Sequence, residues 1–161
     1  VESGESIKSN KYLLDGECVL LSKLNPIFPR VWWAGPFINE RRAVASTEFL
    51  VLTENGGWRL PFIYSLVSSE LFSLTMAARA NGTSNSHQRV GPSDVMTYPL
   101  LDPEDSVQER FSDLVSPFLQ LKSDLIIENR SLAQTRDLLL PRLVSGDLDV
   151  SDLELDLEAV G

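Results

Sequence analysis

The sequence predicts an α+β protein: a mixed domain with a small twisted sheet and a helix, followed by a long α-helix of the coiled-coil type. Three observations predict this class. Short apolar runs are bounded by turn residues, one segment among them has helical spacing, and a heptad repeat fills much of the last third of the chain. We therefore expect a mixed domain over residues 1–102, a long helix over residues 103–143 and an acidic tail over residues 144–161.

Two apolar runs in the first half are predicted to be strands. One covers residues 17–22 and comes directly after Gly16. The other covers residues 47–52 and is followed by the turn residues 54–57. We expect both strands to belong to the small sheet of the mixed domain.

A single amphipathic helix is predicted over residues 61–80. Pro61 suits a first helical turn, and Asn81 with Gly82 gives a stop signal, after which residues 83–93 form a predicted polar loop. The apolar face of this helix recurs at spacings of three, four and seven, and it consists of Ile63, Leu66, Val67, Leu71, Leu74 and Ala78.

A much longer helix is predicted after it. Residues 104–140 contain no glycine and one proline, which is Pro117. About 35 helical residues would extend about 50 Å at 1.5 Å per residue, which is too long to fold back wholly on the preceding domain. Pro117 is expected to kink or interrupt this helix and Pro141 to end it, because proline lacks an amide hydrogen and crowds the preceding turn.

A heptad repeat runs along the long helix. Leu114 and Leu121 occupy its second apolar position, but Glu128 and Thr135 follow there, so the seam weakens toward the end. We predict that the helix pairs with another helix; the alternative is a core helix whose apolar residues happen to repeat. The first heptad position, which we call the pairing seam, consists of Phe111, Phe118, Leu125, Leu132 and Leu139.

The net charge of −9 is unevenly distributed. Residues 1–100 hold nine Lys or Arg and nine Asp or Glu, whereas residues 101–161 hold five and fourteen. The acidity as a whole argues against a nucleic-acid partner, but a charge-balanced first part can still present a local basic face to DNA.

No residue set typical of catalysis is found. His87 is the only histidine, which excludes a two-histidine metal site, and the chain has no G-x-S-x-G, G-x-x-x-x-G-K-[ST] or G-x-G-x-x-G motif. Neighbouring acids such as Glu104 and Asp105 are more typical of a solvated surface than of an acid–base pair. We expect a protein that is not an enzyme and that needs no cofactor or metal.

The single cysteine, Cys18, lies in an apolar run and is predicted to be buried packing rather than a reactive thiol. No apolar run approaches the roughly 20 residues that span a bilayer, and no secretory signal is visible. We expect a cytoplasmic protein with no membrane association.

Several segments resemble the specificity subunits of type I restriction-modification systems. Residues 16–26 (GECVLLSKLNP) and 47–52 (TEFLVL) are similar to strands of that family, and residues 80–90 are similar to a loop of its recognition domain. The most specific match is residues 128–146 (ENRSLAQTRDLLLPRLVSG). They closely resemble the end of the family's conserved helical region, N-x-x-L-x-x-x-R-D-x-L-L-P-(K/R)-L-(L/M/I)-S-G.

The resemblance implies a target-recognition domain that reads one half of a split double-stranded DNA site. In such subunits two recognition domains are joined by two antiparallel helices, which dock modification (methyltransferase) subunits, and a restriction subunit joins to cleave. This chain would be the second recognition domain with the terminal helix. The family's opening segment is missing before Val1, so we expect the domain to be incomplete at its N-terminus. The family's helix opening is degenerate in residues 103–111. A fragment of this kind is expected to form a homodimer through its helix.

Polar side chains in four regions are candidates for contact with DNA. Arginine and lysine suit guanine and phosphate, whereas asparagine and glutamine suit adenine. The alternatives are plain surface charge for Arg41 and Arg42 and a flexible linker for residues 83–89. Trp32 and Trp33 are expected to be core residues rather than stacking platforms. The candidates are Lys23, Asn25, Arg30, Arg41, Arg42, Arg79, Asn85, His87, Gln88 and Arg89.

The heptad and the net acidity leave a second class of function open, a coiled-coil interaction adaptor without DNA binding. A hydrolase or transferase has no supporting residue set in this sequence.

Overall fold

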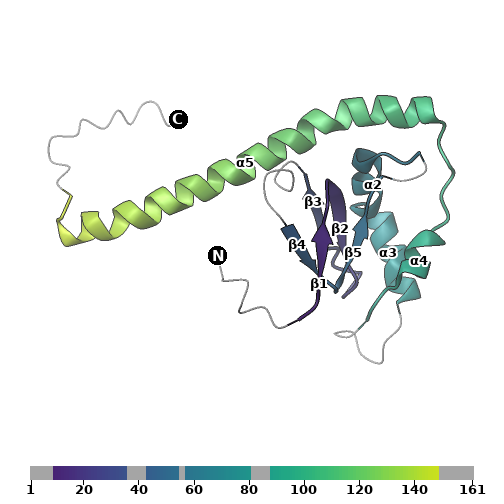
Figure 1. Cartoon of the computed structure of the whole chain (residues 1–161), viewed down its shortest axis with the longest axis horizontal. Coiled ribbons are helices and arrows are strands. Elements are labelled where there is room, and N and C mark those ends of the chain that lie inside the picture. Colours follow the sequence, from purple (N-terminus) through teal and green to yellow (C-terminus); the bar gives the residue numbers. More distant parts are fainter. Residues whose placement is uncertain (1–8, 36–42, 55–56, 81–87, 149–161) are drawn as a thin grey trace. The chain divides into compact units, whose positions relative to one another are not determined.

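The computed structural model describes residues 9–35, 43–54, 57–80 and 88–148 of the chain (Figure 1). Small antiparallel sheets and short helices precede a long C-terminal helix, so the predicted α+β class is confirmed. The chain divides into two units, residues 1–119 and residues 120–161. In chain order the elements are β1 (Lys11–Leu14), β2 (Cys18–Ser22), β3 (Val31–Ala34), β4 (Ala43–Ser46), β5 (Phe49–Leu52), α2 (Leu60–Val67), α3 (Glu70–Arg79), α4 (Pro92–Met96) and α5 (Asp105–Ser145).

The strands of the first unit form two antiparallel sheets. β1 pairs with β4, and β2 lies between β3 and β5 in a three-stranded sheet of order β3-β2-β5. Leu20 at the middle of β2 is opposite Trp32 on one side and Val51 on the other. The two predicted strands are therefore confirmed as β2 and β5, and they are direct neighbours.

β2 is buried on both of its faces. Val19 and Leu21 belong to the core that the sheet shares with α2 and α3, where they join residues such as Val67. Cys18 belongs to a second cluster, which is formed with Leu14 of β1 and residues of β4. Successive side chains of a strand point to opposite faces, so a strand covered on both sides becomes a continuous apolar run. That explains why β2 was so visible in the sequence.

The single helix predicted over residues 61–80 is wrong, because the chain forms α2 and α3 instead. The two helices are bent by 65° at the break. The amide of Ser68 closes α2 on the carbonyl of Tyr64 at 3.0 Å. The hydroxyl of Ser69 accepts a hydrogen bond from the amide of Phe72 at 3.2 Å and thereby caps α3.

The break changes which side of the second helix is buried. Phe72, Ser73 and Met76 are buried in α3, whereas Leu71 and Leu74 of the predicted apolar face are exposed. Among the described residues no single helix combines the length and apolar character needed to cross a membrane, although the bent pair α2 and α3 does so when its two members are taken together.

α5 is one continuous helix of 41 residues, or about 60 Å at 1.5 Å per residue. Pro117 does not interrupt it, and Pro141 does not end it. Each proline removes one intrahelical hydrogen bond, but both prolines and the residues four positions earlier, Asp113 and Asp137, are exposed, so water can satisfy the carbonyls left over. The helix ends at Ser145, and Gly146 follows it with a φ of 79°, the left-handed conformation that suits glycine.

Candidate nucleic-acid interface

Four of the candidate DNA-contacting residues lie side by side in the first unit. Leu24 and Arg89 form an antiparallel bridge. The amide of Asn25 donates to the carbonyl of Gln88 at 3.0 Å, and the amide of Val90 donates to the carbonyl of Lys23 at 3.0 Å. Two segments more than sixty residues apart in the sequence are thus held in one short ladder.

A fifth candidate, Arg30, lies close to these four residues, at the end of the loop between β2 and β3. The amide of Ser22 donates to the carbonyl of Arg30 at 3.0 Å, where β2 ends and β3 is about to begin. Lys23, Asn25, Arg30, Gln88 and Arg89 form what we call the polar cluster.

The turn between β4 and β5 lies against the polar cluster and restrains two of its cations. The amide of Lys23 donates to the carbonyl of Glu48 at 2.9 Å, and its ammonium donates to the carbonyl of Thr47 at 2.7 Å. The guanidinium of Arg89 forms an ion pair with the carboxylate of Glu48 at 3.2 Å. Arg30 is exposed and has no ion pair among the described residues. Three cations and one carboxylate leave this surface locally positive.

Asn25 has an unusual backbone and side chain. Its φ is 49°, the left-handed region that asparagine tolerates better than most residues. The side-chain oxygen Oδ1 is buried and has no hydrogen-bond partner among the described residues. Non-glycine residues in such conformations and unpaired buried polar atoms are both more common at functional sites than elsewhere.

The other candidates do not enlarge the polar cluster. The guanidinium of Arg79 donates to the carbonyl of Asp94 at 2.8 Å and to the hydroxyl of Thr97 at 3.2 Å, so it joins α3 to the α4 region. Arg41, Arg42, Asn85 and His87 lie outside the described residues.

The two neighbouring tryptophans lie in different surroundings. Trp33 packs edge-on against Tyr64 and adjoins the main core. Trp32 is 50% exposed and meets the ring of Phe49 edge-on at 5.0 Å. The expectation of core packing therefore describes Trp33 better than Trp32.

Sequence reasoning missed Glu48 and the apolar residues at the tip of the loop between β2 and β3. Ile27 is 51% exposed and Phe28 is 70% exposed. The signal that marks them is an aromatic residue between two prolines, Pro26 and Pro29, in a segment that also carries lysine and arginine.

The described residues contain no group of three or more His, Cys, Asp or Glu side chains placed to hold a metal ion. A cavity of about 490 Å³ lies between β5, α2, α3 and α4, and its walls include Trp58, Phe72 and Tyr98 but no acidic or basic side chain. Neither observation supplies a nucleophile with its base, or a pair of catalytic carboxylates.

The pairing seam of α5 has two kinds of surroundings. Phe111 belongs to the first unit, where its ring meets that of Phe62 edge-on at 5.9 Å, and a nearby ion pair joins Arg59 to Glu109 at 3.2 Å. The other four seam residues are largely exposed: Phe118, Leu125, Leu132 and Leu139.

Comparison with known proteins adds no family to this description, since no protein-family model, no curated protein and no solved structure matches the chain.

Proposed function

We propose that this chain recognises DNA sequence as a specificity module of the type I restriction-modification kind. In this proposal the polar cluster contacts one half of a bipartite double-stranded site, and α5 docks the modification subunits, to which a restriction subunit is added. The observation that carries the proposal is that backbone hydrogen bonds bring together the segments that hold three cations and two amide residues: Lys23, Arg30, Arg89, Asn25 and Gln88.

The chemistry of the polar cluster suits both parts of DNA recognition. The cations can neutralise phosphates, which supplies most of the affinity and makes it depend on salt. The side-chain amide of Gln88 complements the donor and acceptor that adenine presents in the major groove, and arginine suits guanine. A surface with only lysines would bind phosphates but would offer fewer groups that distinguish one base pair from another.

The exposed seam of α5 supports the second half of the proposal. Leu125, Leu132 and Leu139 are between 40% and 62% exposed and recur every seven residues. An apolar stripe of this spacing is buried in nature by another helix. We propose that the partner helix comes from a modification subunit, a second recognition half or a second copy of this chain, and that the assembly works on DNA in the cytoplasm.

The test removes positive charge from the polar cluster. In Lys23→Ala/Arg30→Ala/Arg89→Ala, we expect affinity for DNA in the presence of the modification subunits to fall at least about tenfold, because each lost phosphate contact removes counterion release. Fluorescence anisotropy on duplexes selected from a randomised pool would measure it. The matched control is Arg110→Ala/Arg130→Ala/Arg136→Ala, which removes the same charge from positions of α5 outside the pairing seam. Complex formation with the modification subunits is first measured for both variants, so that a loss of docking is not mistaken for a loss of DNA contact.

The alternative is a coiled-coil adaptor that binds no nucleic acid, and the seam together with the net charge of −9 favours it. The same experiment separates the two proposals. If no duplex is selected, or if the cluster variant binds DNA as well as the control does, the adaptor is the better account.

A further inference from the structure

The loop between β2 and β3 carries an exposed apolar tip inside the polar cluster. Ile27 and Phe28 are adjacent and are 51% and 70% exposed. Single exposed apolar residues are ordinary on protein surfaces. Two neighbouring ones, one of them aromatic, in a loop that also holds Lys23, Asn25 and Arg30 form a more specific arrangement.

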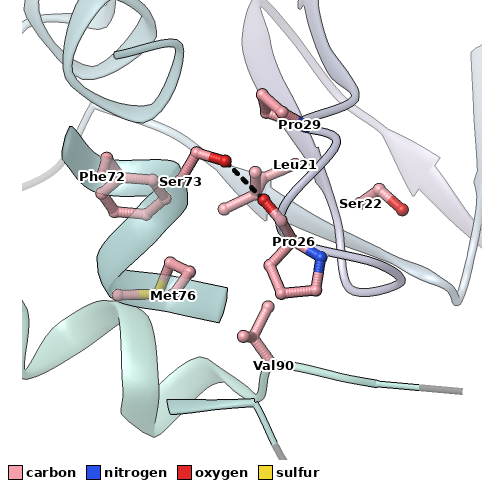
Figure 2. A pocket seen from close by; sticks show the side chains of 8 residues that line it. All are labelled: Leu21, Ser22, Pro26, Pro29, Phe72, Ser73, Met76 and Val90. Carbon is pink, nitrogen blue, oxygen red and sulfur yellow. Dashed lines mark hydrogen bonds between the residues drawn. The ribbon is translucent and has the colours of Figure 1, made fainter. Parts of the chain in front are cut away.

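Hydrogen bonds within the loop and from α3 hold the loop between β2 and β3 in place. The amide of Phe28 donates to the carbonyl of Asn25 at 2.9 Å and closes a turn, and Pro26 fixes the backbone within it. The hydroxyl of Ser73 on α3 donates to the carbonyl of Pro26 at 2.6 Å, a buried hydrogen bond drawn in Figure 2. Pro26 is itself buried, so the base of the turn is anchored while its tip is exposed.

Apolar side chains from three other parts of the domain line the space under the turn. Figure 2 shows them around Pro26 and Pro29, from β2, from α3 and from the segment after Arg89. They are Leu21, Phe72, Met76 and Val90. A turn that contains Pro26, is followed by Pro29 and is anchored by a buried hydrogen bond and this packing loses little conformational entropy when its tip enters a partner.

The charges around the tip indicate which partner it fits. Arg30 lies two residues after Phe28, and Arg89 lies in the segment that is hydrogen-bonded to the other side of the loop. An apolar residue flanked by cations matches a DNA duplex, in which the apolar base stack lies between two rows of phosphates.

We propose that Phe28 is a wedge that inserts between two base pairs of the recognised half-site, partly unstacks them and bends the duplex. This proposal rests on the proposed function and adds a mechanism of recognition to it. Apolar wedges of this kind act at flexible steps, mainly pyrimidine–purine steps, so Phe28 would read the deformability of a step rather than its hydrogen-bonding edge.

The test measures base unstacking at the site. The full chain, together with modification subunits, is used to select duplexes from a pool with a randomised centre. Each base of the selected half-site is then replaced in turn by 2-aminopurine, whose fluorescence rises when it unstacks. We expect one step to brighten on binding of the wild-type chain, and Phe28→Ala to abolish that rise and weaken binding about tenfold. Phe28→Trp should restore both.

Leu71→Ala is the matched control, because Leu71 on α3 is 68% exposed and its truncation also removes an apolar surface side chain. It should leave the fluorescence rise and the affinity unchanged. If the selected duplex is bound but no position brightens, or if Phe28→Ala behaves like the control, the wedge is wrong and the proposed function stands. If no duplex is selected at all, the proposed function fails and the wedge fails with it. If Phe28 instead contacts a protein or a membrane, Phe28→Ala should bind the selected duplex as well as the Leu71→Ala control does.

Discussion

Glu48 and Arg89 form an ion pair within the surface that we propose contacts DNA. Their charged atoms are 3.2 Å apart, and the two side chains are 39% and 57% exposed. An ion pair this exposed stabilises a fold by less than about 1 kcal/mol. In the proposed complex the ion pair matters more for binding. It occupies the guanidinium of Arg89 and places the negative charge of Glu48 where it would repel a DNA phosphate.

We therefore predict that Glu48→Gln tightens DNA binding by about fivefold at low salt, because Arg89 is released and one negative charge is removed. The free energy of unfolding should change by less than about 1 kcal/mol. Anisotropy titration and urea unfolding measure the two quantities. Glu109→Gln is the control, since it breaks the Arg59–Glu109 pair, also 3.2 Å long, and should leave DNA affinity unchanged. Equal effects of the two variants would show that only overall charge matters.

Cys18 gives a pH-dependent contribution to stability. The thiol is 2% exposed, and burial raises its pKa above the ordinary value of 9.0. As pH rises toward 9.0, the thiol of the unfolded chain ionises while the folded one keeps its proton, so this contribution is full at neutral pH and is lost as the solution becomes alkaline.

The measurable consequence is a steeper loss of stability in the wild type than in Cys18→Ala. Urea unfolding from neutral to alkaline pH should show an excess slope of at most about 1.4 kcal/mol per pH unit for this one group. The native thiol should also resist alkylation until the chain unfolds. Parallel pH profiles for the two proteins, or rapid alkylation of the native chain, would contradict the burial of Cys18.

Among the elements, the sequence predicted the long helix and the two strands without exposed positions, and it missed the strands that include exposed ones. α5 was visible because a heptad persists over many turns, and β2 because both of its faces are buried. β1, β3 and β4 each include exposed positions, whereas β5, which is equally short, has none and reads as an apolar run. The break at Ser69 was missed because a serine cap is only one local choice within an otherwise helical pattern.

The same contrast holds for the candidate interface. Lys23, Asn25, Gln88 and Arg89 were chosen from the sequence because of their donors and acceptors. Their proximity depends on the bridge between Leu24 and Arg89, and a single bridge between distant segments has no periodicity that a sequence could display. The sequence can therefore nominate the side chains, but only the tertiary structure places them together.

For α5, we predict that the exposed seam drives association of the chain with itself when no other partner helix is present. Leu125→Asp should shift the sedimenting mass from dimer toward monomer, because it puts a charge into an apolar interface. Arg130→Asp is the control, since residue 130 lies about 140° around the helix from residue 125. A monomeric wild-type chain, or a dimer that Leu125→Asp leaves intact, would exclude pairing through the seam.

Over the whole chain, the uneven charge bears on the rate and affinity of the proposed DNA binding. The excess of acidic residues lies entirely within residues 101–161, and residues 147–158 contain six acids and no base. An acidic segment on the same chain as a DNA-binding surface competes with phosphates for the cations and repels the duplex at long range.

Removal of residues 147–161 lowers the net negative charge from −9 to −3, because the six acids are lost. We predict that the truncated chain binds DNA severalfold tighter at low salt and associates faster, and that the difference disappears at about 0.5 M salt, where screening acts over only a few ångströms. Stopped-flow fluorescence over a salt series would measure it. The control replaces the six acids by Asn or Gln in a chain of full length. If this neutral tail behaves like the wild-type tail while truncation tightens binding, the tail acts by occupying space, and the electrostatic account is wrong.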